Sequence, residues 1–74
     1  MTRKQKHLIE YIFYKELIRN GITPKFSFIH SRYKEDDTEL LQTFVIKENK
    51  TIAVFDRVYA EPDGHVMNYE LLLA

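Results

Sequence analysis

The residues whose types could carry chemistry in this chain are basic and aromatic. Histidine and tyrosine side chains can transfer a proton, and an arginine can stabilise the negative charge that develops on a phosphate. Together such groups suit cleavage of RNA, in which the neighbouring 2′-hydroxyl attacks the phosphorus atom. Alternation along the expected strands predicts that six of them share one sheet face: His30, Arg32, Arg57, Tyr59, His65 and Tyr69.

In residue types alone, this set resembles the sites of small bacterial ribonuclease toxins, which combine a sheet with helices. No sequence motif extends the resemblance, and the chain lacks the additional helix that this fold usually carries. The structural alternative is that Arg32 and Arg57 neutralise neighbouring acids, while the tyrosines pack in the core or at its rim. A ribonuclease-like toxin is therefore the third hypothesis for function, and we predict that the protein is not an enzyme.

Metal and cofactor sites are not predicted. The histidines His7, His30 and His65 occur at no spacing typical of a zinc site, and the chain contains no cysteine. The acidic run at 34–39, KEDDTE, lacks the spacing of a calcium loop and is typical of a solvated turn. We expect His30 to be partly buried and hydrogen-bonded, and we expect no metal and no cofactor.

Periodicity and turn residues predict the elements that position these side chains. Residues 5–20 contain no Gly or Pro and follow Thr2, which forms a capping-box pair with Gln5, while Gly21 and Pro24 predict the end of this helix. Four apolar segments then predict strands, at 25–33, 40–47, 51–59 and 65–73, with the hairpin at 44–59 as the centre of the sheet. The sequence thus predicts one α+β domain over residues 1–74, with an N-terminal helix packed on one face of a four-stranded antiparallel meander sheet, in the order α-β-β-β-β.

Short connections between the strands predict a register. Three pairs are expected near the strand ends: Tyr33 with Leu40, Lys47 with Thr51, and Tyr59 with His65. One sheet face then collects Phe26, Phe28, Leu41, Val45, Ala53, Phe55, Met67, Tyr69 and Leu71. The other collects Ile29, Phe44, Ile46, Ile52, Val54, Val58, Val66 and Leu72, crossed by a polar row of Ser31, Gln42, Asp56 and Asn68 with Glu70 beside it. Because a polar row is costly beneath a helix, we expect the helix to cover the first face.

The uncovered sheet face is the main functional hypothesis. Hydrophobic residues make up 45% of the 74 residues, more than one helix and one sheet face easily hide. We expect Leu8, Ile9, Ile12, Phe13 and Leu17 to face the sheet. A second helical stripe of Tyr11, Tyr14 and Ile18 would form either the rim of the core or a further contact surface. The predicted protein interface therefore comprises Tyr11, Tyr14, Ile18, Ile29, Phe44, Ile46, Ile52, Val54 and Leu72.

Charge is unevenly distributed along the chain. Residues 1–34 contain eight Lys or Arg and two acidic residues, whereas residues 35–74 contain three and nine, so the net charge is zero. The helix places Lys4, Lys15 and Arg19 on one side, and phosphate binding requires such a stripe. A nucleic-acid-binding regulator that uses Arg3, Lys4, Lys15 and Arg19 is the second hypothesis, against the ordinary alternative of a solvated helix face.

The best-supported reading of the sequence is a small, non-enzymatic protein that binds another protein and forms a homodimer. The hydrophobic run after the basic N-terminus is broken by Glu10, Lys15 and Glu16, so neither a signal peptide nor a membrane span is expected. The absence of cysteine favours a cytoplasmic protein. Abundant Ile, Lys, Asn, Tyr and Phe match AT-rich codons, which favours a bacterial or phage source and an inhibitor or regulator of a host protein.

Overall fold

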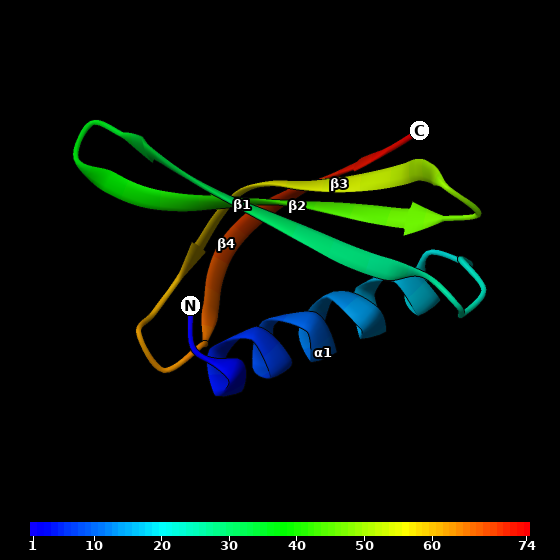
Figure 1. The fold of residues 1–74 in the computed structure, drawn as a ribbon, viewed down its shortest axis with the longest axis horizontal. Helices are drawn as coiled ribbons and strands as arrows, with labels where there is room; N and C mark the ends of the chain where they lie inside the picture. Colours follow the sequence, from blue (N-terminus) through cyan, green and yellow to red (C-terminus); the bar gives the residue numbers. More distant parts are fainter.

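The computed structural model describes residues 1–74 and contains one helix and one sheet. The elements are α1 (Arg3–Arg19), β1 (Ser27–Glu35), β2 (Thr38–Lys47), β3 (Lys50–Ala60) and β4 (Val66–Leu73). The strands form an antiparallel meander in the order β1-β2-β3-β4. Figure 1 shows the helix on one side of the twisted sheet and no element on the other. The predicted α-β-β-β-β fold is confirmed. The helix is not long and apolar enough to cross a membrane.

The helix begins and ends where its sequence requires. The Thr2 hydroxyl accepts a hydrogen bond from the Gln5 backbone, and the Gln5 side chain accepts one from the Thr2 backbone, which completes the predicted capping box. At the other end Gly21 has a positive φ of 82°, and the Ile22 N–H donates to the Leu17 carbonyl. This chain reversal satisfies carbonyls that the helix itself leaves free.

Two tight turns set the register of the first three strands. β1 pairs with β2 in the predicted register along its whole length, from Ser27 opposite Ile46 to Glu35 opposite Thr38. The expected polar loop at 34–39 is therefore only the turn Asp36-Asp37, whose positive φ values of 51° and 64° suit a two-residue hairpin. The predicted register of β2 and β3 is also correct at the centre of the pair, where Val45 lies opposite Ala53. The expected pair of Lys47 with Thr51 is wrong, because the register shifts between Val45 and Ile46 and places Lys47 opposite Lys50.

A β-bulge at Arg57 changes the faces in the second half of β3. Arg57 has a positive φ of 51°, and the register slips between Asp56 and Tyr59. The slip turns Val58 into the core, where it is fully buried, although alternation had predicted it on the opposite face. The pairing of Tyr59 with His65 is also wrong, because Tyr59 lies opposite Asn68. The bulge does not cause this error, since the regular part of the pair already departs from the predicted register, with Ala53 opposite Leu73 rather than Leu71.

In β4, two residues also lie on other sides of the sheet than predicted. Val66 packs against the core, whereas Met67 is exposed, so both residues are exchanged relative to the predicted faces.

The core lies between α1 and the central strands. Phe13 of the helix stacks on Phe55 of β3 with ring centroids 3.8 Å apart, and Tyr69 of β4 meets both rings edge-on. Burial raises the pKa of Tyr69, and the nearby Glu16 carboxylate raises it further. The remaining buried hydrophobic residues of this cluster are Ile9, Leu17, Val45, Ala53 and Val58. The predicted helix face is confirmed except for Leu8, which remains exposed.

A polar bridge fastens the helix to the sheet within this apolar layer. His30 Nδ1 lies 2.8 Å from Thr43 Oγ1, and His30 Nε2 lies 2.6 Å from Glu10 Oε2. The Thr43 side chain is completely buried, and the His30 side chain is only 8% exposed. An ionised Glu10 can only accept, so the Nε2–H donates to it; in the neutral ring Nδ1 then accepts from the Thr43 hydroxyl. The expectation of a partly buried, hydrogen-bonded His30 is confirmed.

Candidate protein-binding face

The sheet face away from the helix, here called the outer face, carries an apolar ladder across all four strands. Ile29 lies opposite Phe44, Phe44 opposite Val54, and Val54 opposite Leu72. Direct cross-strand neighbours on one face interact side by side, so the four form one continuous apolar strip. Ile29 is 57% exposed and Leu72 51% exposed at the two sheet edges, while Phe44 and Val54 between them are half-buried.

Two further residues of the predicted patch flank the ladder. Ile46 is half-buried at the end of β2. Ile52 is also half-buried, but it contacts the core, because an irregularity at the start of β3 interrupts the alternation there. The ladder rather than the flanking pair therefore offers the more accessible apolar surface.

A polar ladder lies beside the apolar one. Ser31 is opposite Gln42, and Asp56 is opposite Glu70. Gln42 Nε2 donates to Asp56 Oδ1 at 3.2 Å, and the Arg57 backbone N–H donates to the same oxygen at 2.9 Å. The bond between Gln42 and Asp56 connects the polar pair on β1 and β2 with the polar pair on β3 and β4. The outer face therefore presents an apolar strip bordered by acidic and amide groups, which is the arrangement of an interface with a polar rim.

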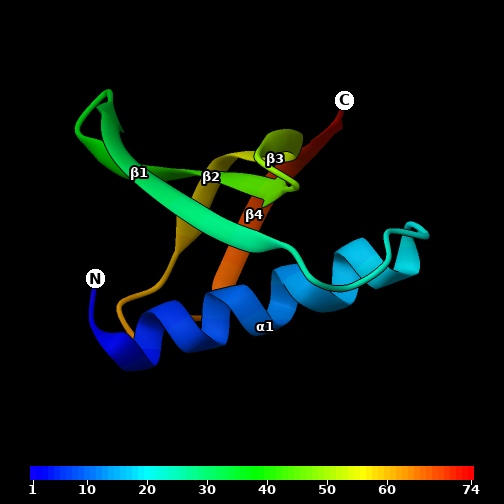
Figure 2. The same ribbon diagram turned by 45° about the vertical axis from the view of Figure 1, so that its right-hand side comes forward.

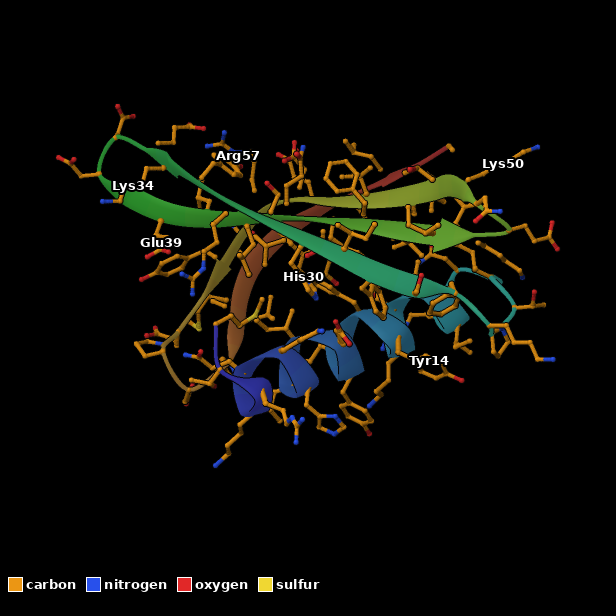
Figure 3. The ribbon with its side chains drawn as sticks, in the orientation of Figure 1. Tyr14, His30, Lys34, Glu39, Lys50 and Arg57 are labelled. Carbon is orange, nitrogen blue, oxygen red and sulfur yellow. The ribbon has the colours of Figure 1, made fainter.

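The bulge holds an ion pair at the far end of this face. Arg57 Nη1 lies 2.7 Å from Glu35 Oε2 of β1, and Figure 3 shows Arg57 on the side of the sheet away from the helix. The hydrogen bond and the opposite charge lower the pKa of Glu35 and raise the pKa of Arg57. Because both groups are exposed, the pair contributes little to stability and mainly orients the guanidinium.

The proposed ribonuclease set does not assemble. The bulge leaves Arg57 on the outer face, whereas His30 lies between sheet and helix with both ring nitrogens engaged (Figure 3). A surface hollow of about 440 Å³ does bring Arg57 together with Tyr59 and Tyr69, but none of the histidines lines it. The expectation that all six residues share one face is therefore wrong.

The helical stripe predicted as a second interface is exposed, and part of it makes internal contacts. Tyr11 is 57% exposed, and Tyr14 and Ile18 are exposed to a lesser degree. The Tyr14 ring lies 5.6 Å from that of Phe26, so it covers the edge of the core. Lys15 Nζ sits 5.5 Å from the centre of the Tyr11 ring. This stripe resembles a rim more than a continuous apolar surface.

The basic residues proposed to contact nucleic acid are all exposed on the helix. Arg19 Nη1 pairs with Glu16 at 3.0 Å, and Lys15 lies over Tyr11. Arg3 and Lys4 have no acidic partner, and no acidic residue occurs in the first turn. The nucleic-acid hypothesis therefore stays a prediction, with only Arg19 of its four residues in an ion pair.

Sequence reasoning singled out Leu72 near the end of β4 but not its neighbour Leu73. Leu73 is 54% exposed, and Met67 near the start of the strand is exposed to the same degree. The available signal was the unbroken apolar run at 71–73, which departs from strict alternation.

Comparisons of the chain with models of protein families, with curated proteins and with solved structures each find no match.

Proposed function

We propose that this protein acts by binding another protein through its outer face and that it performs no chemistry itself. The observation that carries the proposal is the apolar ladder of Ile29, Phe44, Val54 and Leu72, which crosses the whole sheet and has no element over it. Soluble domains rarely leave a contiguous apolar strip in water without a use for it.

The size of the face supports a specific complex. The molecule measures 34 by 22 by 20 Å, so one broad side has an outline of about 750 Å². Each partner in a standard protein interface contributes about 800 Å². The outer face can therefore supply a small interface only if most of it, including the polar ladder, takes part.

Charge defines the chemistry of the partner. Asp56 and Glu70 lie on the outer face beside the ladder, and Arg57 is neutralised by Glu35. Burying two carboxylates without a counter-charge would be costly. The proposed partner therefore presents an apolar strip that is bordered by basic or hydrogen-bond-donating groups.

The test places a photo-crosslinking amino acid at position 29 and, in a matched chain, at position 11. These two residues are equally exposed, at 57%, and lie on opposite sides of the molecule. Cross-linking in host cells should capture a discrete partner from position 29 and not from position 11. With that partner purified, Ile29→Asp should weaken binding by tenfold or more, and Tyr11→Asp should leave it unchanged.

Three results would refute the proposal. Capture from position 11 alone would assign binding to the helix stripe. Capture of nucleic acid rather than protein would favour the second hypothesis. Equal affinities of Ile29→Asp and the unmodified chain would show that the ladder takes no part.

A further inference from the structure

The two edges of the sheet differ in how they are protected. β1 carries Arg32, Lys34 and Glu35, and charged side chains on an edge strand oppose pairing with another chain. β4 contains one charged residue, Glu70, and ends in the apolar run at 71–73. An edge with this composition exposes backbone hydrogen-bonding groups without the usual safeguards.

One hydrogen bond shows which amides of β4 face outward. The Ala74 N–H donates to the Ile52 carbonyl of β3 at 3.1 Å. In an antiparallel pair, alternate residues bond to the same neighbour, so Glu70 and Leu72 also face β3, whereas Leu71 and Leu73 direct their N–H and C=O groups to the free edge.

Tyr69 fits the same alternation. Its N–H donates to the side chain of Asn68 at 3.0 Å rather than to β3. Because this amide already has an acceptor, Leu71 and Leu73 are the residues at the end of β4 whose amides remain for another chain.

We propose that β4 pairs with β4 of a second copy, antiparallel and centred on Leu72, to form a continuous eight-stranded sheet. In this register Leu71 of each copy lies opposite Leu73 of the other, and the two pairs exchange four backbone hydrogen bonds. The Leu72 side chains meet at the two-fold axis. The two Leu71–Leu73 pairs meet on the opposite side of the sheet, which covers the exposed Leu73.

Side-chain chemistry favours this register over those centred nearer the start of β4. A register centred on Glu70 would place two carboxylates directly opposite each other, which is destabilising. A register centred on Leu71 would place Leu72 opposite Glu70. Centring on Leu72 makes all three central pairs apolar, and it joins the apolar ladders of the two copies end to end.

The surroundings of β4 permit this approach. The start of β4 lies near the helix, whereas its end turns away from the helix toward the C-terminus (Figure 1, Figure 2). The paired segment is thus the part of β4 that the helix leaves clear. In the dimer both helices lie on the same side of the sheet, and both outer faces remain open on the other. The dimer does not depend on the proposed partner binding, because it uses the strand edge and not the face.

Hydrogen exchange tests the proposal at the level of single amides. The Leu71 and Leu73 amides should be protected at high protein concentration and should exchange rapidly on dilution, because only the second copy bonds to them. The Leu72 amide should be protected at both concentrations, because it bonds within the chain. Rapid exchange of Leu71 and Leu73 at every concentration would overturn the proposal.

Two proline variants provide a matched test by mass. Light scattering should show twice the chain mass of 8.9 kDa at high concentration. Leu73→Pro removes an edge-facing N–H and should raise the dimer dissociation constant on the order of tenfold or more. Ala74→Pro removes an N–H that faces β3 and should leave dimerisation intact. Circular dichroism checks that both variants are folded.

Two results would contradict the proposed dimer. A strictly monomeric chain at high micromolar concentration would refute the dimer. Retention of the dimer in Leu73→Pro, with its loss in Ile29→Asp, would assign self-association to the outer face. A monomeric chain would leave the test for a partner protein unchanged, because that test is scored by cross-linking from position 29. Self-association through the outer face would appear in that test as capture of a second copy.

Discussion

The bridge between Glu10, His30 and Thr43 should be the most sensitive polar feature of the fold. We consider Thr43→Val, which keeps the shape of the side chain and removes the hydroxyl. His30 Nδ1 would then lose its partner inside a layer where Thr43 has no solvent exposure. A buried polar group left without a partner costs about 1–3 kcal/mol. A domain of this size commonly has a net stability of about 3–5 kcal/mol, so the loss would be a large fraction of the total.

Urea unfolding measures this effect directly. With a slope of about 1 kcal/mol per molar urea, the midpoint should fall by about 1–3 M without a change in slope. His30→Leu removes the other partner, and in that background Thr43→Val should be close to neutral or stabilising, because no unpaired nitrogen remains. The coupling between the two substitutions should therefore be about as large as the single loss.

Two outcomes would refute this reasoning. A midpoint within experimental error of the unmodified protein would show that the hydroxyl contributes nothing. Equal costs of Thr43→Val in both backgrounds would show that the loss has a cause other than the bond to His30.

Three other experiments test separate parts of the structure. Phe13→Ala removes the ring stacked on Phe55 and should cost about 3–5 kcal/mol, leaving the chain largely unfolded by circular dichroism; a cooperative transition near the original midpoint would contradict this. Gly64→Ala should lower the stability in urea unfolding more than Gly21→Ala does. Both glycines have a positive φ, but only at Gly64 would the added Cβ lie 3.1 Å from a backbone atom. Equal losses of stability would contradict the clash. Because the pKa of Tyr69 is raised in the folded protein, the unfolded state loses this proton first, and stability should decline as pH rises past about 10. Tyr69→Phe should reduce that decline. Identical profiles of stability against alkaline pH in the two proteins would contradict this prediction.

The helix and the order of the strands could be predicted because their signals are local. Thr2 and Gln5 mark the start of the helix, Gly21 marks its end, and each turn places polar residues between apolar runs. The register of β1 with β2 also followed from a single short connection. Each of these features depends on residues that are close in the sequence, so one chain is enough to read them.

The bulge could not be predicted in the same way. An arginine at positive φ has no sequence signal of the kind that glycine or asparagine provides. Strict alternation therefore misplaced Val58 after Arg57, and a second register shift between Tyr59 and Ala60 accounts for the change at Val66 and Met67 in β4. The same assumption placed the candidate ribonuclease residues on one face. The positions of the apolar ladder were not affected by this error, because Ile29, Phe44 and Val54 lie in the regular part of the sheet, before the register slips.

Gln5 gives the fold an order of assembly during synthesis. Its side chain caps the first helical turn and also donates to the Pro62 carbonyl in the last turn of the sheet, 57 residues away. The helix can form as soon as its own residues leave the ribosome, but this hydrogen bond cannot form until Pro62 has also emerged. The first turn of the helix is therefore among the first parts to become helical, and its contact with the sheet is among the last to form.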